Sequence, residues 1–257
     1  MPFTFAHPVV VIPIKNKWPT WFSLTGLVVG SMAPDFEYFI RMKTVTTISH
    51  TSAGILLFDL PIVLLVSYVF NSVIKKPLLL NLPSPFNSLY EHLPPDRSIV
   101  LSTKTFWVYV LSAFVGVLTH LLWDSFTHIN GAFVVRSEFL SSYLTIFSTK
   151  VPIYKILQHG STLLGLVSLF IYLRNLALKR KTLQSHRFSD VPARKKVFYW
   201  LYIILISIII SGLRVMFSAN GINIGLLGIV VSSMVAGGMI GLLVMSVLYN
   251  YKHMGTL

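Results

Sequence analysis

Five stretches of the chain are apolar over close to the 20 residues that a membrane-spanning helix needs. They cover residues 55–74, 106–123, 161–178, 198–217 and 222–249. The pattern predicts an all-α, polytopic membrane protein with about five transmembrane helices.

An earlier apolar patch, residues 21–33, is too short to span and is followed at once by Pro34, Asp35 and Glu37. We expect an interfacial or re-entrant N-terminal helix there. The connectors 75–105 and 129–158, rich in Pro, Ser and Asn, are expected to lie along the membrane surface.

The last apolar stretch carries small residues at four-residue spacing, namely Ser233, Gly237 and Gly241. Such a face lets two helix backbones approach closely within a membrane. We interpret it as a packing surface.

The composition agrees with a membrane protein, since 54% of the 257 residues are hydrophobic and only 11% are charged. Soluble domains carry about 25% charged residues. The net charge of +13 is best explained by cytoplasmic loops that face anionic lipid, so we expect a membrane and no nucleic acid as partner. The chain has no cysteine, which excludes disulfides and thiolate metal sites.

The distribution of Lys and Arg predicts the orientation in the membrane. Seven of them fall in the connector 179–197, which should therefore be cytoplasmic. The spans then place residues 1–54 and the connector 129–158 on the outward side.

Candidate chemistry begins with His120, Asp124 and His128, which are spaced by four residues. An α-helix advances about 100° per residue, so these side chains form one stripe. A carboxylate between two imidazoles at the end of an apolar run is costly unless something binds it. Either a metal or a dense hydrogen-bond network is expected there.

The orientation brings further imidazoles and carboxylates to the same outward face. The candidate metal ligands are His7, Asp35, His50, His120, Asp124, His128 and His159. These are ligand types for zinc and its first-row neighbours. A single histidine taken alone favours an interfacial imidazole that is hydrogen-bonded to backbone, whereas the set taken together favours a metal site. Asp35 is also a candidate helix cap, and Glu37 a solvated charge or a general base.

We therefore divide one integral membrane domain, residues 1–257, into three parts. Residues 1–54 form a ligand-bearing interfacial segment and residues 55–178 a three-span core with the metal site. Residues 179–257 supply the basic loop and two C-terminal spans.

Several motifs resemble a known family. They are Pro-Phe-Thr-Phe-Ala-His7-Pro, Gly30-Ser-Met-Ala-Pro-Asp35-Phe-Glu-Tyr, Ser49-His50, His120-Leu-Leu-Trp-Asp124-Ser-Phe-Thr-His128 and Leu157-Gln-His159-Gly. Together they resemble an uncharacterised family of bacterial integral membrane proteins that is similar to inner-membrane metal-dependent hydrolases. A remoter similarity is to the zinc-dependent phospholipase C and single-strand nuclease superfamily. The resemblance implies the bacterial inner membrane as location.

The remoter resemblance also implies roles for the ligands. Asp35, His50, His120 and Asp124 match a first zinc site, and His7 matches a ligand of a second zinc that Asp124 also reaches. His128 and His159 match two histidines of a third site. That site usually includes a glutamate four residues after its second histidine, where this chain has Leu163.

Two classes of function follow. The first is a membrane-embedded, zinc-dependent hydrolase of phosphodiesterase or phospholipase type, in which Asp35 or Glu37 accepts a proton from a metal-activated water. Its substrate would be a lipid or a lipid-linked small molecule, because the site lies at the membrane boundary. The alternative is a protein without catalysis that has a structural metal site or handles metal ions.

Overall fold

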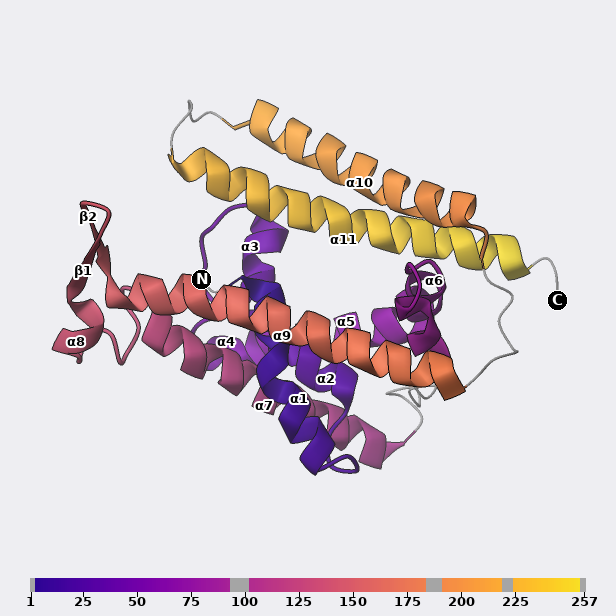
Figure 1. The fold of residues 1–257 in the computed structure, drawn as a ribbon, viewed down its shortest axis with the longest axis horizontal. Coiled ribbons are helices and arrows are strands. Elements are labelled where there is room, and N and C mark those ends of the chain that lie inside the picture. Colours follow the sequence, from indigo (N-terminus) through magenta and orange to yellow (C-terminus); the bar gives the residue numbers. More distant parts are fainter. Residues whose placement is uncertain (1–2, 93–101, 184–190, 219–223, 255–257) are drawn as a thin grey trace. The chain divides into compact units, whose positions relative to one another are not determined.

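The computed structural model describes residues 3–92, 102–183, 191–218 and 224–254 (Figure 1). Its long helices are α7 (Thr103–Thr127), α9 (Ile153–Leu183), α10 (Ala193–Met216) and α11 (Ile224–Met254). A fifth helical run, Ser52–Leu80, joins α4 (Ser52–Gly54), η3 (Ile55–Asp59), α5 (Leu60–Val69), η4 (Phe70–Ile74) and α6 (Lys75–Leu80). The shorter elements are η1 (Thr4–Ala6), α1 (Pro8–Lys17), α2 (Leu24–Gly30), η2 (Ala33–Asp35), α3 (Phe36–Arg41), η5 (Phe86–His92), α8 (Glu138–Ser141), β1 (Tyr143–Ile146) and β2 (Thr149–Pro152).

Within these described ranges, five helical runs are long and apolar enough to cross a membrane. They are Ser52–Leu80, Thr103–Thr127, Ile153–Lys179, Ala193–Met216 and Gly225–Tyr251. The predicted all-α polytopic fold is thus confirmed. Most spans are longer than predicted because polar residues at their ends continue the helix. Helix α9 begins eight residues early, which shortens the preceding connector.

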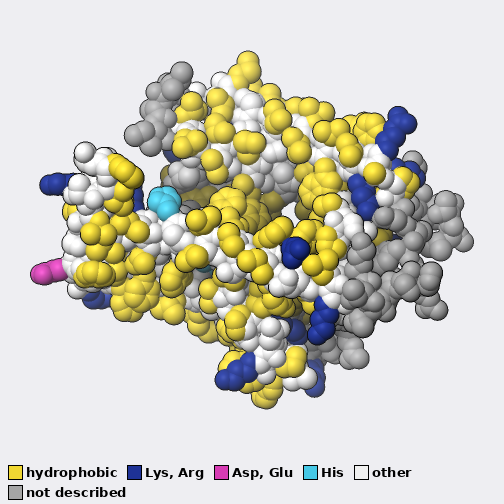
Figure 2. Space-filling model, in the orientation of Figure 1, with side chains coloured by type: hydrophobic (Ala, Val, Ile, Leu, Met, Phe, Trp, Pro, Cys, Tyr) yellow, Lys and Arg dark blue, Asp and Glu magenta, His cyan; other side chains and the backbone are white. Residues whose placement is uncertain are grey.

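Side chains exposed along the spans are mostly apolar. On α10, for example, Leu201, Ile204, Leu205 and Ile208 are each about half exposed. The face shown in Figure 2 is dominated by hydrophobic side chains, with Lys and Arg scattered singly. Such a surface is suited to lipid contact rather than to water.

Contacts divide the chain into two compact units. The first comprises residues 1–35, 48–67 and 99–172, and the second comprises residues 36–47, 68–98 and 173–257. All seven candidate ligands belong to the first unit. His120 and Asp124 lie on α7, His128 directly follows it, and His159 lies on α9. The other three lie in or beside short elements. Glu37 belongs to the second unit.

In the first unit, the short helix α2 packs closely along α7. A Cβ on Gly116 would lie 2.6 Å from the carbonyl oxygen of Leu27, and one on Gly30 would lie 2.6 Å from that of Ala113. Ser23 caps α2 by accepting a bond from Gly26 N. With seven residues, about 10 Å, α2 is too short to cross a membrane, as expected for the patch 21–33.

In the second unit, α10 and α11 lie side by side as an antiparallel pair (Figure 1). A Cβ on Gly237 would lie 2.8 Å from Ser207 Cα, and one on Gly241 would lie 3.1 Å from Ile203 O. Ser233 Oγ donates to Ser211 Oγ at 3.0 Å. The predicted packing face is thus confirmed. Part of the basic connector, residues 184–190, lies outside the described residues.

Helix α1 and a hairpin of the first unit were not predicted. Helix α1 forms despite Pro13 in its interior, with Pro8 at its first turn. The connector after α7 contains an antiparallel hairpin of β1 and β2, in which Phe147 and Ser148 adopt positive φ at the turn. A two-residue turn with positive φ matches the twist of the flanking strands.

Candidate metal centre

The stripe that the sequence predicts lies on the last turns of α7. His120 is fully buried and Asp124 nearly so, and their side chains meet with 3.3 Å between His120 Nε2 and Asp124 Oδ2. His128 follows immediately as the C-cap residue of α7. The helix continues through Thr127, so both His120 and Asp124 belong to the span itself.

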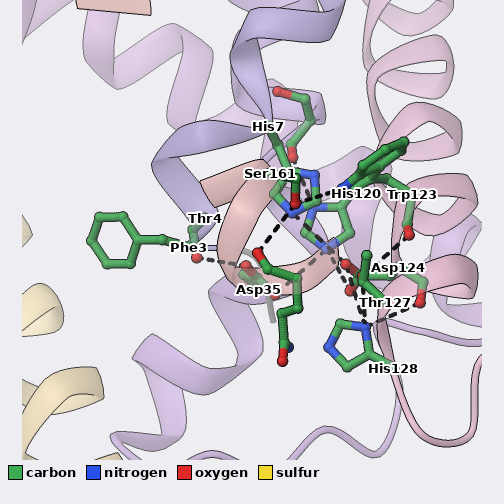
Figure 3. A network of polar contacts seen from close by, with 12 residues as sticks. Phe3, Thr4, His7, Asp35, His120, Trp123, Asp124, Thr127, His128 and Ser161 are labelled. Atoms are coloured by element: carbon green, nitrogen blue, oxygen red, sulfur yellow. Dashed lines mark hydrogen bonds and ion pairs between the residues drawn. The ribbon is translucent and has the colours of Figure 1, made fainter. Parts of the chain in front are cut away.

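Two segments remote in sequence complete a four-residue cluster with this helix. Asp35 ends the 3-10 turn η2, directly after Pro34, and His50 lies just before α4. Ligand atoms of Asp35, His50, His120 and Asp124 all lie within 4.8 Å of one another. Asp35 Oδ1 is 3.5 Å from His120 Nε2, and His50 Nε2 is 3.5 Å from Asp124 Oδ2. Figure 3 shows how the labelled members of this cluster converge.

These separations suit a small cation better than hydrogen bonds. Zinc bonds of about 2.0–2.1 Å in a tetrahedral sphere separate neighbouring donor atoms by roughly 3.3–3.4 Å. The three separations at His120, Asp35, His50 and Asp124 are 3.3, 3.5 and 3.5 Å. Hydrogen bonds between nitrogen and oxygen are typically about 2.7–3.2 Å long.

Several buried atoms that face this cluster have no hydrogen-bond partner among the described residues. They include His120 Nε2, Asp35 Oδ1, both carboxylate oxygens of Asp124 and His7 Nε2. Each unsatisfied buried polar group costs about 1–3 kcal/mol, and charged groups cost more. A bound cation would satisfy the lone pairs of this donor set together.

Other polar groups form hydrogen bonds with the ligand atoms that do not face the cluster. His120 Nδ1 lies 2.8 Å from the carbonyl oxygen of Ser31 and must donate to it, which leaves the Nε2 lone pair facing the cluster. Thr4 Oγ1 donates to Asp35 Oδ2 at 2.5 Å, and His50 Nδ1 lies 3.0 Å from Ser49 Oγ. Such partners fix ring orientation and tautomer at metal sites.

Asp124 also faces a second set of imidazoles. Its Oδ2 lies toward His120 and His50, whereas its Oδ1 is 3.8 Å from His7 Nε2 and 3.5 Å from His128 Nδ1. The ring of His7 stacks on that of His120 with centroids 3.9 Å apart. Asp124 is therefore placed between two groups of potential ligands.

The two histidines on the Oδ1 side of Asp124, His7 and His128, are suited to bind metal as neutral rings. Burial is the main cause that lowers the pKa of His7 to about 4. Burial also lowers the pKa of His128 below its ordinary value. Both imidazoles are thus neutral at pH 7. His128 Nδ1 lies 3.1 Å from the carbonyl oxygen of Asp124 and donates to it, so the lone pair of His128 is on Nε2.

The chain matches one protein-family model. The family model described as "Domain of unknown function (DUF4184)" matches residues 1–249. The chain belongs to the DUF4184 family. No curated protein and no solved structure matches it. The match to DUF4184 includes all seven candidate ligands and gives no activity.

The DUF4184 structure brings six of the seven predicted ligands to Asp124 or its immediate neighbours. The exception is His159, which is exposed on α9 and makes no hydrogen bond or ion pair within the described ranges. Its neighbours Gly160 and Ser161 line a cavity beside His7, whereas His159 is turned about 100° away from Gly160 on the helix. The pairing of His128 with His159 thus gains no support, and His128 lies with His7 instead.

Glu37, the other predicted proton acceptor, is turned toward its own unit. Its Oε1 accepts bonds from Arg41 Nε at 2.8 Å, Thr47 N at 3.0 Å and Thr47 Oγ1 at 2.9 Å. These bonds tie the end of α3 to the segment that follows it. The geometry favours a structural role for Glu37.

Sequence reasoning missed the supporting residues Thr4, Ser31 and Ser49. Each lies one to four positions before a ligand, namely His7, Asp35 and His50. For Thr4 and Ser49, whose hydroxyls make the contacts, a small hydroxyl residue close before a candidate ligand was the available signal. The Ser31 contact uses a backbone carbonyl, which no side-chain pattern reveals.

Proposed function

We propose that this protein is a membrane-embedded, zinc-dependent hydrolase of phosphodiesterase or phospholipase type, acting on a lipid or a lipid-linked substrate. The observation that carries the proposal is the convergence of Asp35, His50, His120 and Asp124 at the end of a spanning helix. Imidazole and carboxylate donors without thiolate suit zinc. Similarity to the phospholipase C and nuclease superfamily in ligand order supports the same chemistry.

We assign separate roles in such a reaction, metal binding and proton acceptance, to residues of the chain. When bound at a site with an open position, zinc supplies a water with a pKa near 7. For a site in which His50, His120 and Asp124 hold the ion, we assign Asp35 as the proton acceptor, because Thr4 binds Oδ2 and leaves Oδ1 facing these ligand atoms. Glu37 is the weaker candidate, since Arg41 and Thr47 already occupy Oε1.

A second cation is supported by the two-sided placement of Asp124. His7 and His128 approach Oδ1, while His50 and His120 approach Oδ2. A carboxylate shared in this way is typical of sites that bind two metals and clamp a phosphoryl oxygen between them. His7 and His128 would be the ligands specific to the second ion.

We also propose on which side of the membrane the site lies. We place the site on the outward side of a bacterial inner membrane, because the basic residues of the 179–197 connector favour the cytoplasm. A phospholipid in the outer leaflet could then reach the site by lateral diffusion.

A structural metal site is the rival, and one observation favours it. Four protein donors are already gathered, as in closed zinc sites, whereas catalytic zinc usually keeps three protein ligands and an open position. Such a site would hold the η2, α4 and α7 segments of the first unit together without catalysis.

Metal content and hydrolysis, measured on the same detergent-purified samples, separate the two functions. We expect at least one zinc per wild-type chain and release of phosphorylated headgroups from a panel of phospholipids. His120→Ala should lose both, and His159→Ala, an exposed histidine outside the cluster, should lose neither. Stoichiometric zinc without hydrolysis of any lipid would favour the structural site, and unchanged zinc in His120→Ala would refute both.

A further inference from the structure

A cavity of about 540 Å³ lies beside the metal cluster, between α1, α7 and α9 of the first unit. Its volume is within the roughly 300–1,000 Å³ typical of ligand sites. His7 lines the cavity and also faces Asp124, so one imidazole is common to the cavity and the cluster. The His7 wall of the cavity therefore adjoins the cluster.

The cavity extends along the surface of α9. Lining residues run from Ile156 to Ser168, a distance of about 18 Å along the helix axis. Small residues leave the space open on this side, in particular Gly160, for which an added Cβ would meet nothing within 4 Å. The cavity is thus elongated along α9, within a segment apolar enough to span.

The walls suit hydrocarbon rather than a polar ligand. Val9, Val10, Ile156 and Leu164 contribute alkyl side chains. The hydroxyl of Ser161 already accepts a bond from Trp123 Nε1 at 3.2 Å and donates to Gln158 O at 3.1 Å. A polar ligand would lose hydrogen bonds to water here with little compensation.

Contacts at both edges hold the cavity in shape. Trp123 and Ser161 join α7 to α9, and Phe3 N donates to Thr162 Oγ1 at 3.0 Å, which joins the N-terminal segment to α9. Gly165 lets Ala6 approach, since a Cβ there would lie 3.0 Å from Ala6 Cβ. The side toward Ala6 is therefore closed, whereas the space at Gly160 is open.

We propose that this cavity binds one hydrocarbon chain of an anionic phospholipid whose phosphate is held at the metal cluster. An apolar cavity with a candidate cation site behind its His7 wall matches a molecule with an anionic head and a long apolar tail. The inference rests on the proposed function for the position of the phosphate. The hydrocarbon site itself depends only on the shape and chemistry of the cavity.

Photocrosslinking with a phosphatidylglycerol that carries a diazirine in one acyl chain tests the proposal. Purified wild-type protein should be labelled mainly within residues 156–168, as mapped by peptide mass spectrometry. Gly160→Trp, whose ring would occupy the open space, should reduce this labelling at least fivefold and leave the zinc content unchanged. Gly238→Trp is the matched control, because that glycine is also partly exposed on a spanning helix with nothing within 4 Å of an added Cβ.

The outcomes distinguish this inference from the hydrolase. Labelling spread evenly over the spans, or labelling of 156–168 that Gly160→Trp does not reduce, would overturn the hydrocarbon site. Hydrolysis in wild type with an unlabelled cavity would overturn it as well and leave the hydrolase standing. Labelling of the cavity in a protein without hydrolysis would keep the hydrocarbon site and remove the hydrolase.

Discussion

At the scale of single residues, Asp124 connects the whole cluster. Its Oδ2 faces His120 and His50 and its Oδ1 faces His7 and His128, although the residue belongs to an apolar helix. Burying such a carboxylate is costly, and an uncompensated one is strongly destabilising. The cost is offset when cations bind on both sides of it.

Replacing Asp124 by Asn keeps the size of the side chain and removes its charge. We expect Asp124→Asn to weaken zinc binding by at least tenfold, measured by competition with a fluorescent zinc chelator. Glu138→Gln is the control, because Glu138 is an exposed acid in the same unit. Equal zinc affinity in Asp124→Asn and wild type would exclude Asp124 as a ligand.

A substitution at Thr4 tests whether its hydrogen bond positions Asp35 as a ligand. Thr4→Val retains the shape but removes the hydroxyl that donates to Asp35, so zinc affinity should fall by about tenfold, within the range for partners of metal ligands. The exposed Thr145→Val on β1 serves as control in the same titration. An unaltered affinity in Thr4→Val would mean that the position of Asp35 does not depend on this bond.

The sequence located the cluster because ligand chemistry and helical spacing are local properties. His120 and Asp124 followed from four-residue spacing, and Asp35 and His50 from their positions before the first span. The orientation of a side chain around a helix near its end is not local, which explains why His159 was included although it is exposed. The bond of His120 to the Ser31 carbonyl depends on tertiary packing and has no sequence pattern.

At the scale of elements, hydropathy predicted the five spans and a short helix within residues 21–33, but neither helix α1 nor the hairpin of β1 and β2. A span predicted from hydropathy ends at the first polar residues, whereas the helix itself can continue through them. Most spans in the structure are therefore longer than the predicted ones. Helix α1 was missed because Pro13 usually argues against a helix interior. The hairpin was missed because its strands are exposed along most of their length and lack an alternating pattern.

The contact between α2 and α7 explains how a helix of seven residues is held in place. Gly116→Ala would put a Cβ within 2.6 Å of Leu27 O and 2.7 Å of Ser31 N. We expect the free energy of unfolding to fall by about 1–3 kcal/mol, as for other overpacked contacts, which thermal unfolding in detergent would register as a lower Tm. Gly160→Ala, with open space around it, should leave Tm unchanged or slightly higher. A Tm for Gly116→Ala equal to that of wild type would show that α2 does not pack in this way.

At the scale of the whole molecule, the proposed orientation decides which compartment the site faces. The natural sequence has no cysteine, so single introduced cysteines report topology without background. Ser148→Cys lies in the turn of the hairpin and Ala193→Cys at the start of α10, and both positions are exposed. A membrane-impermeant maleimide should label Ser148→Cys in intact spheroplasts and Ala193→Cys only after lysis. The reverse pattern would place the metal cluster on the cytoplasmic side.

The central claim is that distant segments of the first unit jointly bind a metal ion. X-ray absorption at the zinc edge, on purified protein loaded with one zinc per chain, tests it most directly. We predict a shell of nitrogen and oxygen donors at about 2.0–2.1 Å, with imidazole scattering and without sulfur, and a reduced imidazole contribution in His120→Ala. A zinc shell identical in wild type and His120→Ala, or one without imidazole scattering, would contradict the account.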